Sequence, residues 1–399
     1  MQEEKFPYID QLDETVLDEA ILRFGTPTYV FDVEQAKKRA RAFRGIIGQA
    51  ADLCYAMKAN PFLVRAMAEV VNRIEVCSMG EFRICKQKEI PAEKLLISGV
   101  MKDRDDLWEI LETYGNRCHY TIESLNQYAI LNEWARSSGK KVPVYLRLTS
   151  GNQFGMDEET LTNIVELEQD KDLLEICGIH YFSGTQKKRK KTLEELTYLD
   201  EVFARLKEKT GYQVTELEYG PGLAVPYFAR QADERFETLE AIADALAKMQ
   251  WQGKVTLEMG RAFVADCGYY ITTVKDTKRS GDQNYCIIDG GMHQVNYDGQ
   301  IRGMYQPKLT IRPQGARGIY QNWTICGELC TGNDILVQNI KIDDLRVGST
   351  IIFENTGAYA VTEGMALFLS HVLPAVVLYD PVGGFTQVRA RRETYVWNS

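Results

Sequence analysis

The sequence predicts an α/β chain in which a (β/α)8 barrel is followed by a mainly antiparallel C-terminal β domain. Two observations carry this prediction. Between about residues 50 and 260, short β-rich runs alternate with longer amphipathic segments, and after about residue 275 short strands follow one another with little helix. Alternation of the first kind indicates parallel strands joined by helices, and a closed barrel needs eight such repeats. Strands separated only by turns indicate an antiparallel sheet.

Eight runs are expected to form the barrel strands, because each is short, rich in apolar residues and bounded by turn signals. They are Asp52–Lys58, Arg73–Ser78, Lys94–Gly99, Cys118–Glu123, Val142–Leu148, Glu175–Phe182, Glu216–Gly220 and Lys254–Gly260. Apolar residues recur at helical spacing between these runs, as in Phe62–Asn72, Asp105–Tyr114 and Glu194–Thr210.

The second domain is expected from five further short strands: Ile287–Asp289, Lys308–Ile311, Trp323–Gly327, Asp334–Asn339 and Thr350–Glu354. The opening segment Pro27–Asp32 also has the pattern of a strand, which either joins this β domain or leads into the barrel. We therefore expect the barrel to span residues 34–272. Residues 1–33 together with 273–399 would form the β domain.

Composition narrows the class of protein. The chain has 399 residues, 45% of them hydrophobic, which is enough for two cores. Its net charge of −9 disfavours a nucleic-acid partner. Nine cysteines without a framework spacing, and a polar start at Met1–Lys5 that does not resemble a signal peptide, favour the cytoplasm. No metal site is expected.

The apolar stretch Met365–Tyr379 is interrupted by Ser370, His371 and Pro374. It falls short of the roughly 20 apolar residues that a membrane-spanning helix needs. We expect it to form buried core, at a subunit contact, and we expect no membrane partner.

Chemically useful side chains gather at the ends of the predicted barrel strands, where barrel enzymes place their active sites. A lysine, a carboxylate, arginines, hydroxyls and glycine turns would meet there, and a phosphorylated cofactor that forms an imine would use each of them. These groups are Lys58, Glu75 with Ser78, Ser98, Arg147, Ser183–Thr185, Gly220–Gly222 and Glu258–Arg261.

Each group also has a simpler explanation when it is taken alone. Lys58 would be a lysine that reaches the surface, and Gly220-Pro221-Gly222 an ordinary turn. Glu258 and Arg261 would be a surface pair, and Cys330 a small buried hydrophobe. The imine chemistry therefore depends on their occurring together.

Taken in order, these segments resemble the diaminopimelate/ornithine decarboxylase family, the fold-type III enzymes that use pyridoxal phosphate (PLP). The resemblance runs over nearly the whole chain. The matching segments are Phe24-Gly25-Thr26-Pro27 with Tyr29-Val30 and Asp32, Tyr55–Asn60, Cys77–Glu81, Arg147 with Gln153–Met156, Glu258–Arg261, Cys330 with Asp334, and Gly357-Ala358-Tyr359.

The resemblance implies a role for each matching residue. Lys58 would form an imine with PLP, Phe182 would stack on its ring, and Glu258 would pair with its pyridine nitrogen. The phosphate would be held by Ser183 or Thr185, Gly220, Gly222, Arg261 and Tyr359. Cys330, supplied by the second subunit of a homodimer, would return a proton after carbon dioxide leaves. Small-molecule recognition would involve Arg147, Tyr297, Thr331 and Asp334.

The chain departs from the family at positions that determine substrate choice. Phe182 replaces a histidine, and Pro221 removes one backbone donor from a Gly-Gly-Gly loop. Thr331 and, by gapless counting from Asp289, Tyr297 stand where diaminopimelate decarboxylases have a glutamate and an arginine for the distal amino and carboxylate groups. We therefore expect an amino acid other than diaminopimelate.

The loop Asp289–Gln300 resembles members in specialised biosynthetic pathways, some of which act on carrier-tethered aminoacyl groups. The basic run Lys187–Lys191 would then dock an acidic acyl carrier protein or its phosphopantetheine phosphate, although a solvated helix start is the simpler explanation. Two other functions remain open: an amino-acid racemase on the same scaffold, and a non-catalytic homologue that binds PLP.

Overall fold

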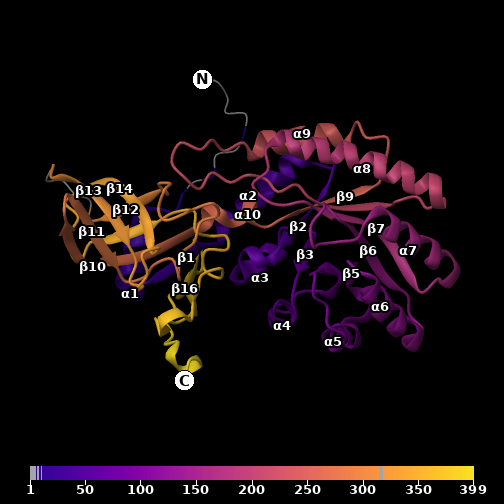
Figure 1. Ribbon diagram of the computed structural model, residues 1–399, viewed down its shortest axis with the longest axis horizontal. Coiled ribbons are helices and arrows are strands. Elements are labelled where there is room, and N and C mark those ends of the chain that lie inside the picture. The colour runs from indigo at the N-terminus through magenta and orange to yellow at the C-terminus, as the bar shows by residue number, and fades with distance from the viewer. Residues whose placement is uncertain (1–5, 7–8, 10, 314–317) are drawn as a thin grey trace. The chain divides into compact units, whose positions relative to one another are not determined.

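The computed structural model describes residues 6, 9, 11–313 and 318–399, and it divides into two compact units (Figure 1). The barrel unit comprises residues 40–224 and 234–262, and the described residues up to 39 join 225–233 and 263–399 in the β unit. Residues 1–5, 7–8 and 10 of the predicted domain 1–33 lie outside the described residues. The domain boundaries at residues 34 and 272 stay a prediction.

The barrel is closed by eight parallel strands, each hydrogen-bonded to the next, with β9 returning to β2. All eight runs expected from the sequence are present, but the first ends earlier than expected, so that Lys58 lies in a 3₁₀ turn, Met57–Ala59, after the strand. The strands are β2 (Asp52–Ala56), β3 (Arg73–Val76), β4 (Leu95–Ile97), β5 (His119–Ile122), β6 (Val142–Leu148), β7 (Leu174–Phe182), β8 (Glu216–Gly220) and β9 (Lys254–Met259).

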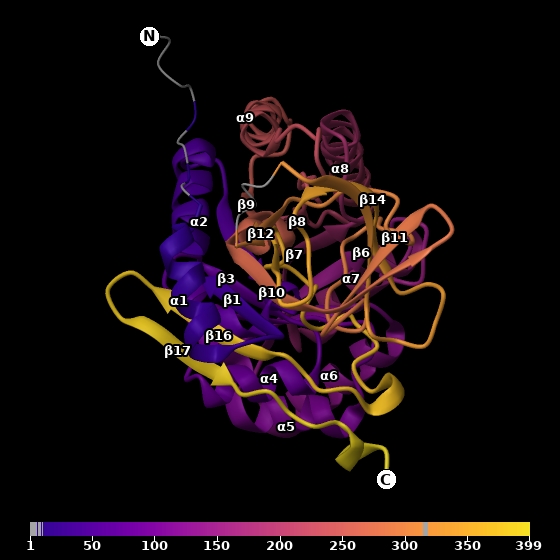
Figure 2. The same ribbon diagram turned by 90° about the vertical axis from the view of Figure 1, so that its left-hand side faces the viewer.

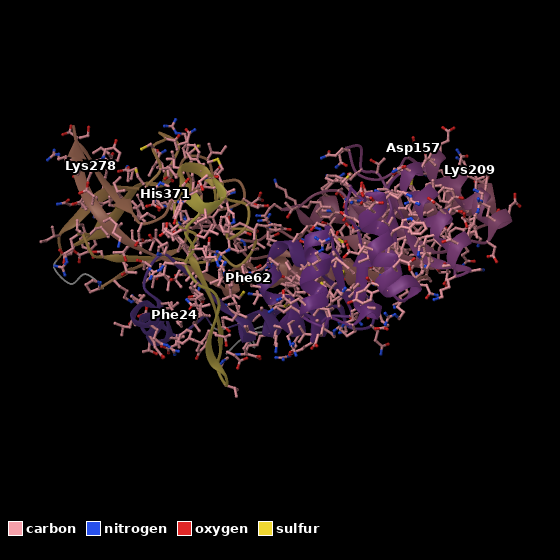
Figure 3. All side chains as sticks on the ribbon, turned by 90° about the horizontal axis from the view of Figure 1, so that it is seen from below. Phe24, Phe62, Asp157, Lys209, Lys278 and His371 are labelled. Atoms are coloured by element: carbon pink, nitrogen blue, oxygen red, sulfur yellow. The ribbon has the colours of Figure 1, made fainter. Side chains whose placement is uncertain are left out.

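Helices surround the barrel strands (Figure 1). Their starts follow ordinary capping chemistry: Asp157, labelled in Figure 3, accepts the Thr160 N–H at 2.7 Å before α7. The helices of this unit are α3 (Val64–Ala68), α4 (Met79–Gln87), α5 (Arg104–Tyr114), α6 (Leu125–Ser138), α7 (Glu158–Lys171), α8 (Arg189–Thr210) and α9 (Arg235–Leu246).

The β unit contains a mainly antiparallel sheet, as the sequence predicts. β1 settles the open question about the opening strand, because it pairs with β10 and β16 inside this sheet and not with the barrel. Figure 2 shows β16 beside its antiparallel partner β17. The strands are β1 (Thr28–Asp32), β10 (Gly268–Ser280), β11 (Gln283–Ile288), β12 (Leu309–Arg312), β13 (Tyr320–Cys326), β14 (Ile335–Asp343), β15 (Thr350–Phe353), β16 (Ala375–Asp380) and β17 (Gly384–Arg389).

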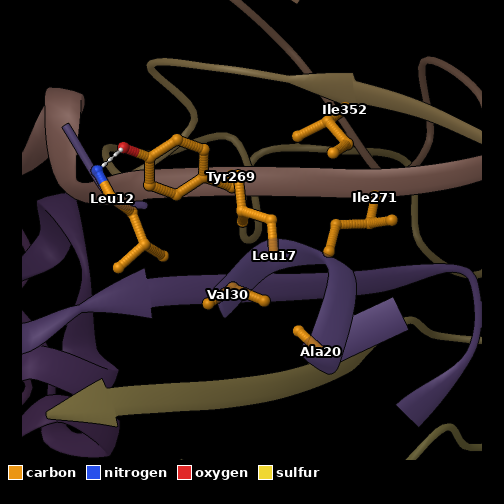
Figure 4. Packing of buried hydrophobic residues seen from close by; sticks show 7 residues of the cluster. All are labelled: Leu12, Leu17, Ala20, Val30, Tyr269, Ile271 and Ile352. Carbon is orange, nitrogen blue, oxygen red and sulfur yellow. Dashed lines mark hydrogen bonds between the residues drawn. The ribbon is translucent and has the colours of Figure 1, made fainter. Parts of the chain in front are cut away.

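Three further α-helices lie outside these two sets of elements. α1 (Glu14–Phe24) packs on the sheet of the β unit, α2 (Val33–Ile47) continues from β1 into the barrel unit, and α10 (Arg261–Val264) follows β9. Figure 4 shows how α1 is held: Leu17 and Ala20 meet Val30, Ile271 and Ile352 in one buried cluster. Ile271 and Ile352 are distant in sequence from α1, so the cluster fixes the N-terminal segment to the sheet.

Tyr269 is expected to stabilise this contact, because its hydroxyl accepts the N–H of buried Leu12 at 2.9 Å (Figure 4). The Tyr269→Phe variant leaves that donor without a partner and should lower the free energy of unfolding by about 1–2 kcal/mol. Urea unfolding measures the difference. Tyr320→Phe, on an exposed ring, is the control and should change the midpoint little.

The stretch Met365–Tyr379 is only partly core, which corrects the expectation from its composition. Ala375–Val377 are buried in β16, whereas Met365, Leu367, Phe368 and Leu369 are exposed. Phe368 and Leu369 belong to a short 3₁₀ turn, Phe368–Ser370, in which the backbone of Leu369 is non-helical. Among the described residues, no helix is long and apolar enough to cross a membrane.

Candidate active site

Lys58 is placed by the sharp bend that ends β2. The Tyr55 hydroxyl donates to the carbonyl of Asn60 at 2.9 Å, which closes the chain around the turn that carries the lysine. Lys58 Nζ forms an ion pair with buried Glu75 and lies 3.7 Å from Glu258 Oε1. The amine is therefore held between carboxylates from β3 and β9.

Glu258 also faces His180 of β7. The Oε2 atom of Glu258 lies 3.1 Å from His180 Nε2. Among the described residues, this oxygen atom accepts no hydrogen bond. Burial lowers the pKa of His180 to about 3, so the imidazole is neutral and adds no second charge beside Lys58. An oxygen of Glu258 thus remains for a ligand that carries a proton.

Two loops after β7 and β8 form a cradle of close backbone contacts. A Cβ at Gly222, where φ is +59°, would lie 2.2 Å from the carbonyl oxygen of Gly184. A Cβ at Gly220 would lie 2.3 Å from the ring of Phe182. Only glycine fits at Gly222, because both the space and the left-handed backbone exclude other residues.

Arg261 extends toward the same cradle, since its Nε donates to the hydroxyl of Thr185 at 3.3 Å. This places a guanidinium and a hydroxyl together, and both groups are suited to a phosphate. Their role as phosphate ligands stays a prediction. Ser183 differs: its hydroxyl donates to Glu195 of α8 at 2.5 Å.

Arg147 lies in a buried charged group that the sequence did not reveal. Its guanidinium is 3.0 Å from Glu123 Oε1 and stacks over the ring of Phe154 at 4.9 Å. Lys102 Nζ lies 3.7 Å from the same oxygen, and burial lowers its pKa to about 8. A role for Arg147 in substrate binding stays a prediction.

Cys330 is exposed in the loop between β13 and β14 of the β unit. Asp334 organises this loop: its buried carboxylate accepts the N–H groups of Met292 at 2.7 Å and Leu329 at 2.9 Å. Thr331 is half-buried beside Cys330. Asp334 therefore holds the loop that carries Cys330 in place. Its contact with substrate stays a prediction.

Tyr297 and Tyr359 occupy different surroundings in the β unit. Tyr297 is buried, and its hydroxyl donates to the carbonyl of Glu354 at 2.6 Å. Tyr359 has φ +65°, a conformation that costs a non-glycine residue about 1–3 kcal/mol and that is concentrated at functional sites. Gly357 beside it must be glycine, because a Cβ would lie 1.8 Å from the Val264 carbonyl.

The predicted residues therefore fall into two sets. The barrel unit brings together Lys58, Glu258, Phe182, Thr185, Gly220, Gly222 and Arg261, and the β unit carries Cys330, Thr331, Asp334, Tyr297 and Tyr359. The sequence did not indicate the pairing partners His180, Glu123, Lys102 and Glu195, and it placed Lys187 in a surface run. At the start of α4 the Ser78 hydroxyl caps the helix by accepting the Glu81 N–H, and the Glu81 carboxylate accepts the N–H of Cys77, one residue before the cap.

The barrel set fits PLP. Lys58 presents an amine at a strand end, Glu258 has a buried oxygen left for a pyridinium proton, and Gly222 with Arg261 and Thr185 provides donors for a phosphate. Among the described residues, no group of three or more acidic, histidine or cysteine side chains is arranged to hold a metal ion.

This fold and site define a barrel enzyme that uses PLP. The chain belongs to the pyridoxal-dependent decarboxylase family, whose pyridoxal binding domain matches residues 33–265. It is a PLP-dependent amino-acid decarboxylase. The relatives that match are decarboxylases, which favours the decarboxylase over the racemase and the non-catalytic homologue.

Relatives match along nearly their whole length. The chain is 26% identical to the L-glutamyl-[BtrI acyl-carrier protein] decarboxylase of Niallia circulans, covering 93% of this chain and 92% of that protein. It is 27% identical to the diaminopimelate decarboxylase of Aquifex aeolicus, covering 88% of each. The fold resembles diaminopimelate decarboxylase from Methanocaldococcus jannaschii in complex with L-lysine, with a TM-score of 0.85, 23% identity and coverage of 94% and 92%.

Proposed function

We propose that this decarboxylase acts on an amino acid attached to a carrier protein through its side-chain carboxyl. The α-carboxylate is the group that leaves as carbon dioxide, so a carrier can hold the substrate only at another functional group. A side-chain thioester is neutral, and a site that receives it needs no ion pair for the distal end of the substrate.

The observation that carries this proposal is the neutral character of the two positions expected to read the distal group. The ring centroid of Tyr297 lies 5.7 Å from that of Tyr227 and 5.9 Å from that of Phe228. The hydroxyl of Tyr297 already donates to the backbone carbonyl of Glu354. Thr331 carries no charge. The Niallia relative acts, by its name, on a glutamyl group bound to an acyl-carrier protein, which supports the same substrate class here.

Bound PLP supplies an electron sink for the electron pair left when the α-carboxylate departs. We propose that Lys58 anchors the cofactor, that Glu258 keeps a proton on its ring nitrogen, and that Phe182 stacks on the ring. Gly220, Gly222, Thr185 and Arg261, with Tyr359 as a further candidate, hold the phosphate. Cys330 then delivers a proton to the α-carbon.

A homodimer is part of the proposal, with Cys330 supplied by the partner subunit. Exposed apolar side chains in the two turns Phe368–Ser370 and Tyr395–Trp397 support it. Asn398 Nδ2 donates to the Leu367 carbonyl at 2.7 Å, and this bond joins the two turns into one surface. A surface of this kind is typical of a protein interface. We also infer a cytoplasmic location, because all nine cysteines are unpaired.

The docking surface for the carrier is smaller than the sequence indicated. Lys187 is buried, which leaves Lys188, Lys190 and Lys191 exposed around the start of α8. No acidic residue lies in the first turn of this helix, so these cations add to the positive end of the helix dipole. Such a surface suits the acidic face of a carrier protein.

Reversing these three charges to glutamate tests the proposal. For a glutamyl group on a carrier protein, kcat/KM should fall about 10-fold or more, because electrostatic attraction of the partner is lost. Turnover of the same glutamyl group on free pantetheine should not change. The control reverses two exposed cations, Lys207 and Lys209, at the other end of α8. Equal losses for both substrates, or for both variants, contradict docking at this surface.

A further inference from the structure

Lys187 is buried between two barrel loops, although it opens the most basic run of the chain. Only 7% of its side chain is exposed. Its Nζ donates to Ser183 Oγ at 3.0 Å and to the carbonyl of Gly220 at 3.1 Å. One ammonium group therefore joins the loop after β7 to the loop after β8.

The backbone near Lys187 makes a second connection between the same loops. The Lys187 N–H donates to the carbonyl of Gly222 at 2.8 Å, and the Thr192 hydroxyl of α8 donates to the carbonyl of Pro221 at 3.2 Å. The carbonyl groups of the Gly-Pro-Gly turn are thus bound one after another. Bonds to these carbonyls hold the turn in one orientation and so fix where its N–H groups point.

Glu195 of α8 provides the counter-charge. Its buried carboxylate lies 2.6 Å from Lys187 Nζ and accepts hydrogen bonds from Ser183 at 2.5 Å and from the Tyr219 hydroxyl at 2.9 Å. Burial lowers the pKa of Lys187, and the bond to Glu195 opposes that shift. The Ser183 proton is directed to Glu195, which leaves Thr185 as the hydroxyl beside Arg261.

The turn that Lys187 holds is poor in donors, because Pro221 has no N–H. A phosphate bound there depends more strongly on the exact placement of the N–H groups that remain, and on positive charge close by. We propose that Lys187, with Glu195 as its counter-ion, is a positioning residue for the cofactor phosphate. The proposal rests on the phosphate lying at the Gly220–Gly222 turn, as proposed above.

The test compares PLP with pyridoxal, which lacks the phosphate. Lys187→Met alone would leave Glu195 buried without a counter-charge, so the main variant is the double substitution Lys187→Met/Glu195→Gln, which removes both charges. Holoenzyme is stripped of cofactor and titrated with each compound while protein fluorescence is followed. The dissociation constant for PLP should rise about 10- to 100-fold, and that for pyridoxal less than about 2-fold.

Two further variants make every outcome decisive. Lys207→Met removes an exposed charge from the far end of α8 and should change neither constant. Gly222→Ala should weaken PLP but not pyridoxal. If Gly222→Ala spares PLP, the phosphate site is misplaced and the role of Lys187 is lost with it. If Gly222→Ala acts as expected but the double variant weakens both compounds equally, or neither, Lys187 serves the fold alone.

Discussion

The Lys58→Ala variant is expected to lose decarboxylation by at least about 1,000-fold, together with the visible absorbance of bound cofactor. The reason is chemical, because no other side chain described at this site offers an amine between the Glu75 and Glu258 carboxylates. Steady-state release of carbon dioxide and an absorbance spectrum of the purified protein measure the two effects.

Lys58→Arg separates the charge from the chemistry. A guanidinium preserves the positive charge opposite Glu75 but stays protonated and does not form an imine, so activity should be lost while the thermal midpoint is largely kept. Lys88→Ala, on an exposed lysine, should behave as wild type. An arginine variant that retained the cofactor absorbance would exclude Lys58 as the anchor.

The barrel was predictable because each strand is a buried parallel strand with its own local signal. β6 and β8 begin and end where the sequence predicts. β2 ends two residues before the predicted end at Lys58, because the apolar residues of the 3₁₀ turn that follows have the same pattern as a buried strand. β10 was missed for the opposite reason: Gly268–Ser280 is long and ends in charged residues, which resemble a loop.

The side chains of the site were predictable by identity, but their partners were not. Lys187 is the clearest example, since five basic residues in a row favour a solvated surface. No sequence pattern around Lys187 indicates that Glu195 of α8 forms an ion pair with it. The same holds for Arg147 of β6, whose ion-pair partner Glu123 directly follows β5. Contacts between elements depend on the closed barrel, which local sequence patterns do not contain.

Mixing two inactive variants tests the proposed dimer most directly. Lys58→Ala and Cys330→Ala are each expected to be inactive, because the first lacks the cofactor anchor and the second the proton donor. If each site combines the barrel of one subunit with Cys330 of its partner, random mixing should restore about a quarter of the wild-type sites. Activity is measured after the two proteins are co-expressed or exchanged under mild denaturation.

The recovered activity in this mixture depends on which chain supplies Cys330 to each site. In a mixed dimer one site receives both substitutions and the other receives neither, so the active fraction reflects which chain supplies Cys330 and not how stable either variant is. Mixing Lys58→Ala with Lys58→Arg is the control, because no combination of these chains contains the anchor lysine. If Cys330 acted within its own chain, every site in the first mixture would carry one substitution, and no activity would return.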